Sequence, residues 1–225
     1  MAVILSNILT TQELASLQAD LATATWGDGS ATAGEQARSV KANEQLAPED
    51  AIAKRGAALI TGALARHSGF LATALPRRLT QPMFSRYSTG HAYGLHIDNA
   101  LRMQGNERLR TDLAATLFLS DPDSYDGGEL TIETGLGTPS VKLPAGHMIL
   151  YPATTRHRVA PVTRGQRTAA ILWVQSMVRD NAQRDLLLDL DRSTQALSKS
   201  LGANNPQVVA LTGTYHNLLR LWLDA

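Results

Sequence analysis

The chain has 225 residues, of which 44% are hydrophobic, so it is long enough to bury the core of one domain. There are 21 Lys and Arg residues against 20 Asp and Glu residues, and this near balance does not favour binding to nucleic acid or to an anionic membrane. The sequence contains no cysteine, which excludes disulfides, iron–sulfur clusters and thiolate ligands, so a bound metal needs nitrogen and oxygen ligands.

The N-terminus starts with apolar residues, but neither a basic segment nor a cleavage site of small residues accompanies them. No later run reaches the roughly 18 apolar residues that a membrane-spanning helix needs. We therefore expect a cytoplasmic protein that is not inserted in a membrane.

Two amphipathic helices are predicted in the N-terminal third of the chain. Leucines recur at helical spacing in residues 9–26, and Thr10 with Glu13 forms the pattern of a capping box. Residues 48–67 have the same helical period, and Gly69 follows soon after the expected end. The segment between the two helices is rich in Gly, Ala and polar residues, which predicts an irregular or strand-like excursion.

Short strand-like runs, divided by turn signals, then follow one another along the chain. No helical crossover of about a dozen residues separates them, as a parallel sheet would require. The pattern favours a mainly β fold with α-helices, in which the core is a double-stranded β-helix, or jelly roll. The runs are "RRLTQPMFSRYS", "AYGLHIDNA", "TDLAATLFLS", "GGELTIET", "TPSVKLPA", "HMILYP", "TRHRVAPV" and "RTAAILWVQSMV".

The helical period returns near the C-terminus in two segments with apolar stripes. These stripes predict helices that cover the β domain or a partner subunit, so the sequence also allows a homodimer. We expect three parts: an N-terminal helical region at 1–75 that packs on the core, a jelly-roll domain at 76–178 and a C-terminal helical extension at 179–225.

Three residues in the β-rich part form a candidate metal site. His96 and Asp98 can bind one metal, because side chains two apart on a strand point to the same face. His157, at the start of another strand-like run, is the third candidate ligand. Two histidines and one carboxylate suit Fe(II) and leave positions open for substrate and oxygen. Zn(II) used for hydrolysis and a cupin-like module that binds a dicarboxylate without turning it over remain open as alternatives.

Arg167 follows His157 by ten residues, in a run where a strand can direct it into the jelly roll behind the metal. A guanidinium is suited to bidentate binding of a carboxylate, so this residue predicts a dicarboxylic cosubstrate. The His-x-Asp pair alone is weak evidence. The ordered set of ligands and arginine in one β-rich segment favours a site over coincidence.

These residues resemble the Fe(II)/2-oxoglutarate-dependent dioxygenases, and more closely the bacterial PKHD-type hydroxylases. That family is similar to prolyl and lysyl hydroxylases and includes PiuC-like proteins linked to iron uptake. The resemblance implies that His96, Asp98 and His157 bind Fe(II). It also implies that Arg167 binds the C5 carboxylate of 2-oxoglutarate, and that the hydroxyl of Tyr87 can reach the same cosubstrate. A plain core role is the alternative for this tyrosine. The matching stretches cover most of the chain and are "FSRYSTGHAYGLHIDNA", "RTDLAATLFLSDPDSYDGGELTIE", "VKLPAGHMILYPATTRHRVAPVTRGQRTAAILWVQSMVRD" and "LTGTYHNLLRLW".

The resemblance implies hydroxylation of an unactivated C–H bond with O2 as oxidant and L-ascorbate to keep the iron reduced. Asp98 fills the coordination position that halogenating relatives leave vacant for chloride. The substrate remains open between a small molecule, such as one related to siderophores, and a peptide, as in prolyl hydroxylases. Phe118 stands where some animal prolyl hydroxylases carry a second tyrosine for the cosubstrate, so this chain lacks that hydroxyl.

For the remaining histidines and arginines near these motifs we mostly expect structural roles. His147 is expected to be an ordinary loop residue. His91 is expected to be one too, with a place at the substrate mouth as the alternative. Arg102, Arg108 and Arg110 follow the His-x-Asp run. We expect them in a solvated loop, with a loop over the active site as the alternative.

Overall fold

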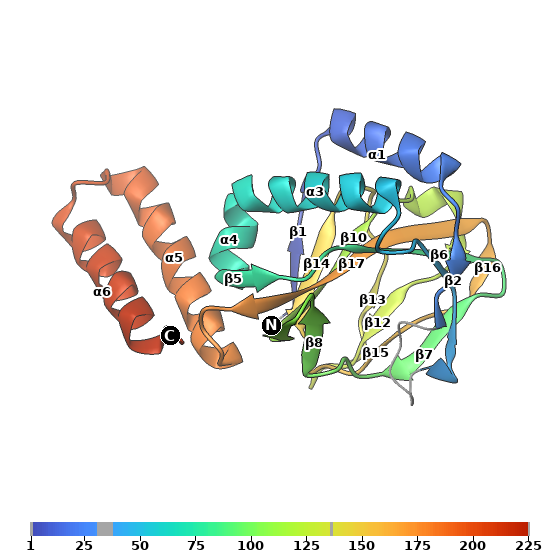
Figure 1. Ribbon diagram of the computed structural model, residues 1–225. Helices are drawn as coiled ribbons and strands as arrows, with labels where there is room; N and C mark the ends of the chain where they lie inside the picture. The colour runs from blue at the N-terminus through green and yellow to red at the C-terminus, as the bar shows by residue number, and fades with distance from the viewer. Residues whose placement is uncertain (1, 31–37, 136, 225) are drawn as a thin grey trace.

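The computed structural model describes residues 2–30, 38–135 and 137–224, and two antiparallel sheets form its centre (Figure 1). The larger sheet contains, in spatial order, β1 (Val3–Leu5), β14 (Met148–Pro152), β10 (Leu113–Phe118), β17 (Gln166–Ser176), β6 (Met83–Ser88), β4 (Glu44–Gln45) and β2 (Gly27–Asp28), and β5 (Pro76–Leu79) also pairs with β17. The smaller sheet contains β13 (Ser140–Val141), β12 (Leu130–Ile132), β15 (His157–Val159), β7 (Ala92–His96) and β3 (Lys41–Ala42). The predicted jelly-roll core is confirmed.

The central strands of the larger sheet have two different apolar faces, because successive side chains point to opposite sides. On β17, Ala170 and Leu172 belong to a buried cluster that includes residues of the N-terminal helices. Ile171 and Trp173 belong with a second cluster, which also contains residues of the smaller sheet. One face of the larger sheet is therefore covered by helices, and the other closes the space in which the candidate site lies.

The helices that cover the larger sheet begin at side-chain caps. They are α1 (Thr11–Thr23), α3 (Ala51–Arg66) and α4 (Ser68–Ala74). Thr10 and Glu13 form the predicted capping box at the start of α1. The second predicted helix ends at Arg66, close to the expected end at residue 67, but Gly69 does not follow it as a terminator, because Gly69 lies inside the additional helix α4. The His67 ring starts this additional helix, since its Nδ1 accepts a hydrogen bond from the Phe70 N–H at 3.0 Å.

The N-terminal region supplies strands as well as helices. β1 and the short strands β2, β3 and β4 come from it and join the two sheets. The short strands fall in the segment for which a strand-like excursion was predicted. β1 was not predicted, because three residues are too few to show a β period. The division of the chain at residues 75 and 178 stays a prediction.

The segment after the His-x-Asp run is a β-hairpin, and the prediction of a solvated loop there is wrong. Strand β8 (Leu101–Gln104) pairs with β9 (Glu107–Arg110). Arg110 donates to Asp112 through both Nε (2.7 Å) and Nη2 (3.0 Å), and its Nη2 also donates to Ser176 O on β17 at 3.3 Å, which fastens the end of the hairpin to the larger sheet. A further short ladder joins β11 (Asp126–Gly127) to β16 (Val162–Arg164), and a 3-10 turn, η2, spans Pro122–Ser124.

The two C-terminal helices, α5 (Asn181–Leu201) and α6 (Pro206–Trp222), form a pair at one end of the molecule (Figure 1). A small cluster of Leu75, Val178 and Leu187, against which Trp222 packs, connects them to the rest of the fold. Exposed apolar side chains remain on this pair, and they are Leu186, Leu197, Leu201, Val209 and Leu221. Within the described residues, none of the helices combines the length and apolarity needed to cross a bilayer.

Candidate metal centre

Strand pairing in the smaller sheet brings the two histidines together. His96 is the last residue of β7 and His157 is the first residue of β15, and the two are direct partners in the antiparallel register. Opposite residues of such a pair hold their side chains close on one face. The two imidazole centroids are accordingly 4.2 Å apart. Register alone thus joins ligands from distant parts of the sequence.

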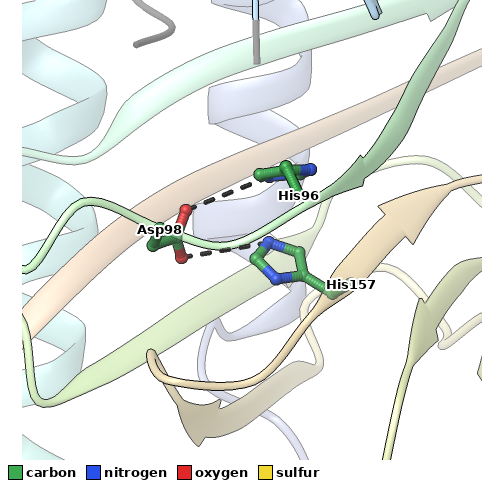
Figure 2. A group of neighbouring side chains, drawn as sticks. All are labelled: His96, Asp98 and His157. Atoms are coloured by element: carbon green, nitrogen blue, oxygen red, sulfur yellow. Dashed lines mark ion pairs between the residues drawn. The ribbon is translucent and has the colours of Figure 1, made fainter. Parts of the chain in front are cut away.

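Asp98 completes the group from just beyond the end of β7 (Figure 2). Its Oδ1 lies 4.0 Å from His96 Nε2, and its Oδ2 lies 3.9 Å from His157 Nε2. One ligand atom of each residue lies within 4.8 Å of the other two. All three side chains are at least nine-tenths buried. One ion can therefore be coordinated by the three residues after small rotations of their side chains.

Backbone carbonyls fix which nitrogen of each imidazole is available. His96 Nδ1 lies 2.8 Å from Gly94 O, and His157 Nδ1 lies 3.0 Å from Thr155 O. A carbonyl oxygen can only accept, so each Nδ1 carries the proton and each Nε2 keeps its lone pair. Burial, and then the neighbouring His157, lower the pKa of His96 to about 4, which keeps this imidazole neutral near pH 7. The donor set fits a divalent metal.

Trp173 holds the carboxylate in place, a role that our sequence interpretation missed. Its indole Nε1 donates a hydrogen bond of 2.9 Å to Asp98 Oδ2. A donor of this kind orients a ligating carboxylate. The signal was available in the sequence: Trp173 and Arg167 are six residues apart on one strand, so their side chains share a face.

Arg167 is a buried cation on β17, with only 1% of its surface exposed. Its guanidinium carbon lies 5.3 Å from the ring centroid of Tyr87 and 5.2 Å from that of Phe118. Its Nε has no hydrogen-bond partner within the described part of the chain. Because a buried charge without a counterion is costly, this guanidinium marks a position for an anion.

Tyr87 is the direct strand partner of Arg167 and is 2% exposed. Burial raises its pKa to about 12, although the positive charge of Arg167 acts in the opposite direction. The hydroxyl is therefore a neutral donor at physiological pH. Phe118 offers only its ring to the guanidinium, which agrees with the missing hydroxyl noted in the sequence.

A single cavity joins the metal ligands to Arg167 and Tyr87. Its described lining includes one acidic residue, Asp98. It also includes two basic residues that were not assigned to the site from the sequence, Lys41 on β3 and Arg102 on β8. The other lining residues are Gln45, Met83, Ser85, Tyr93, Thr116, Leu130, Tyr151, Val159, Ile171 and Trp173.

Two further histidines lie outside this lining. His91 follows β6, and its Nδ1 accepts a hydrogen bond of 3.3 Å from the Ser88 N–H, so it supports a turn. His147 precedes β14, and its carbonyl accepts a hydrogen bond of 2.9 Å from the Phe118 N–H. The His91 ring contact is structural, whereas the His147 contact involves only its backbone, so the expected role of the His147 side chain stays a prediction.

The jelly roll and this ligand set define the class of 2-oxoglutarate-dependent iron oxygenases, and residues 82–175 match the 2OG-Fe(II) oxygenase superfamily. Residues 181–224 match the PKHD-type hydroxylase C-terminal domain. A PKHD-type hydroxylase of Xanthomonas axonopodis pv. citri is 52% identical over 222 residues and covers 97% of both chains. One of Burkholderia lata is 51% identical with the same coverage. The chain belongs to the PKHD-type hydroxylases, as the sequence motifs indicated.

Solved structures with the same fold have low sequence identity. A prolyl-4-hydroxylase of Pseudomonas putida has a TM-score of 0.53 at 18% identity, covering 78% of this chain and 92% of that chain. A prolyl hydroxylase from Trichoplax adhaerens, in complex with a peptide fragment of hypoxia inducible factor, has a TM-score of 0.56 at 15% identity, covering 82% and 86%. At such identities the likeness supports the fold. The activity, that of an Fe(II)- and 2-oxoglutarate-dependent hydroxylase, comes from the family.

Proposed function

We propose that His96, Asp98 and His157 hold the Fe(II) of this hydroxylase. The observation that carries the proposal is the convergence of two imidazole lone pairs and one carboxylate at the end of a strand pair. This ligand set leaves coordination positions open for other groups. Zn(II) hydrolysis and a binding module without turnover, the two alternatives from the sequence, are less well supported, because they leave Arg167 or the family membership unexplained.

Arg167 binds the C5 carboxylate of 2-oxoglutarate in this proposal, and the Tyr87 hydroxyl donates to the same end of the molecule. Support comes from the buried guanidinium, which lacks a hydrogen bond at Nε among the described residues, and from the cavity that connects it to the metal ligands. A guanidinium suits this task because its donors match the two oxygens of a carboxylate. The apolar rings around it exclude water and strengthen the contact.

Bound iron and 2-oxoglutarate supply the chemistry: O2 is consumed, 2-oxoglutarate becomes succinate and CO2, and one oxygen atom enters a C–H bond of the substrate. The chain itself holds and orients the reactants. Trp173 keeps Asp98 directed at the metal, and the backbone carbonyls keep both imidazoles in the ligating tautomer. Asp98 occupies the position that a halide would need, so hydroxylation is the expected outcome.

The test is succinate formation from 2-oxoglutarate by the purified, iron-loaded protein. His157→Ala is expected to abolish it and Asp98→Ala nearly to abolish it, whereas Arg167→Ala mainly raises the 2-oxoglutarate concentration required. His147→Ala is the matched control, because that histidine lies outside the cavity lining, and it is expected to retain wild-type activity. Full activity in folded His157→Ala would overturn the ligand assignment.

The primary substrate is either a small molecule, with a link to iron uptake and siderophore metabolism as our first hypothesis, or a peptide. The siderophore hypothesis comes from the family resemblance, and the peptide hypothesis comes from the likeness to prolyl and lysyl hydroxylases. A mass increase of one oxygen atom on iron-chelating metabolites, or on members of a peptide panel, would distinguish the two.

Two further parts of the proposal concern L-ascorbate and the oligomer. L-ascorbate is expected to prolong turnover by returning oxidised iron to Fe(II), and its omission should shorten activity without changing the initial rate. The exposed leucines of α5 and α6 support a homodimer, because apolar side chains gather on this helix pair. Light scattering should give twice the mass of one chain.

A further inference from the structure

A second arginine reaches the metal cavity from the β8–β9 hairpin. The guanidinium carbon of Arg102 lies 3.5 Å from the centroid of the Trp173 ring, whose edge bonds Asp98. Its Nε is buried and has no hydrogen-bond partner in the described ranges of the chain. A guanidinium stacked on an indole keeps its in-plane donors free, so Arg102 can bind an anion.

Arg102 and Arg167 lie at different ends of the cavity. The Arg102 guanidinium stacks on Trp173, which is six residues from Arg167 on β17. A strand rises about 3.3 Å per residue, so about 20 Å of backbone separates Trp173 from Arg167. Asp98, a proposed metal ligand, bonds the Trp173 end. The C5 carboxylate of a cosubstrate held at Arg167 therefore does not use Arg102. This second arginine is therefore available to another molecule.

A second cavity adjoins the metal cavity at Arg102. It lies between the β8–β9 hairpin and the start of α3, and its lining includes Pro48, Gln81 and Met103. Four residues line both this cavity and the metal cavity, and they are Gln45, Met83, Arg102 and Trp173. A molecule that approaches the metal from the second cavity must pass the guanidinium.

The charges around this junction favour an anion. Lys41 lines the metal cavity and adds to the positive charge, while its Nζ donates to Gly29 O at 2.8 Å. The acid of the second cavity, Glu49, is paired with Lys54 at 2.9 Å. Asp98 attracts the guanidinium, but the bound metal takes up that charge in the working enzyme.

We propose that Arg102 binds a carboxylate of the primary substrate and that the second cavity holds the remainder of the molecule. The inference rests on the proposed function, because the metal and 2-oxoglutarate must occupy the other end of the cavity. The Arg102 proposal restricts the primary substrate to compounds that carry a carboxylate. When both oxygens of that carboxylate bind the Arg102 guanidinium, the C–H bond to be oxidised lies between the guanidinium and the metal.

The test compares matched anionic and neutral probes on protein saturated with 2-oxoglutarate and with Zn(II), which fits the same ligands without reacting with O2. The probes are benzoate against benzamide and N-acetylglycine against N-acetylglycinamide, and ligand-observed NMR measures their dissociation constants. Arg102→Gln removes the charge, Arg102→Lys keeps it, and Arg108→Gln removes an exposed charge from the same hairpin as a control. Zn(II) and 2-oxoglutarate affinities are measured first in each sample.

We expect at least one carboxylate to bind about tenfold or more tightly than its amide, as loss of a charge-assisted contact predicts. This preference should disappear in Arg102→Gln, persist in part in Arg102→Lys and remain complete in Arg108→Gln. The inference is wrong if neither pair shows a preference, or if the preference survives in Arg102→Gln. A change of Zn(II) affinity alone would mean that Arg102 only positions Asp98. Absence of 2-oxoglutarate binding to the wild type would instead refute the proposed function, and this inference with it.

Discussion

Replacement of Arg167 by methionine separates its function from its contribution to stability. Arg167→Met keeps most of the side-chain volume and removes a buried charge that has no ion-pair partner among the described residues. Contacts with the rings of Tyr87 and Phe118, at 5.3 and 5.2 Å, stabilise the buried guanidinium by about 2 kcal/mol each. Desolvation of an unpaired buried ion costs several kcal/mol. The two effects nearly cancel, so the variant without cosubstrate should be at least about as stable as the wild type.

The same replacement should sharply weaken the binding of 2-oxoglutarate. Two charge-assisted hydrogen bonds to one carboxylate are worth about 1.5–3 kcal/mol each, so the affinity should fall by a factor of about 10²–10⁴. At a concentration of about 100 times its dissociation constant, a ligand stabilises the protein by about 2.7 kcal/mol. For a chain of this size the shift in melting temperature is about 5–10 °C.

Thermal melts of metal-loaded protein, with and without 2-oxoglutarate, measure both effects. The wild type should show the ligand-induced shift and Arg167→Met should not, although its melting temperature without ligand is equal or higher. Arg108→Met is the control, because Arg108 is exposed, and it should behave like the wild type. A variant that melts well below the wild type and still gains the full shift with 2-oxoglutarate would refute the reasoning.

Three other substitutions test separate parts of the account. Trp173→Phe removes the hydrogen bond to Asp98 and should lower metal affinity about 10–100-fold in a chelator competition, and an unchanged affinity would contradict that role. Gly128→Ala adds a Cβ at a φ of +67° and 3.1 Å from Arg167 Cδ. It should lower stability by about 1–2 kcal/mol and weaken 2-oxoglutarate binding, and normal calorimetric binding would count against it. Thr10→Ala should cost about 1 kcal/mol in urea unfolding with 2-oxoglutarate binding intact, because the cap lies far from the site.

The sequence predicted the β core and the capped helix because both have strong local patterns. The apolar runs of β10, β14 and β17, which turn residues separate, and the Thr10–Glu13 pair are visible in a single sequence. The β8–β9 hairpin was missed because its strands are short and charged, and its position depends on Arg110 contacts with Asp112. The separate helix α4 was missed because a histidine cap resembles an ordinary residue in the sequence.

The sequence indicated the three ligands together with Arg167 and Tyr87, but it did not indicate the other polar residues of the cavity, which are Lys41, Arg102 and Trp173. His-x-Asp spacing anticipates a shared face, although Asp98 lies just past the end of β7. The opposition of His96 and His157 depends on register between distant strands, which spacing does not reveal. Arg102 was assigned to a solvated loop because its stacking on Trp173 is a tertiary contact.

An anaerobic titration of the metal-free protein, first with Fe(II) and then with 2-oxoglutarate, tests the central claim most directly. The account predicts one equivalent of Fe(II) and a visible absorption band once the 2-oxo acid chelates it. This band should decay when O2 is admitted, with formation of succinate. His157→Ala should give no band. A folded wild-type protein that binds Fe(II) but gives no band, or a His157→Ala variant that gives the full band, would contradict the site proposed above.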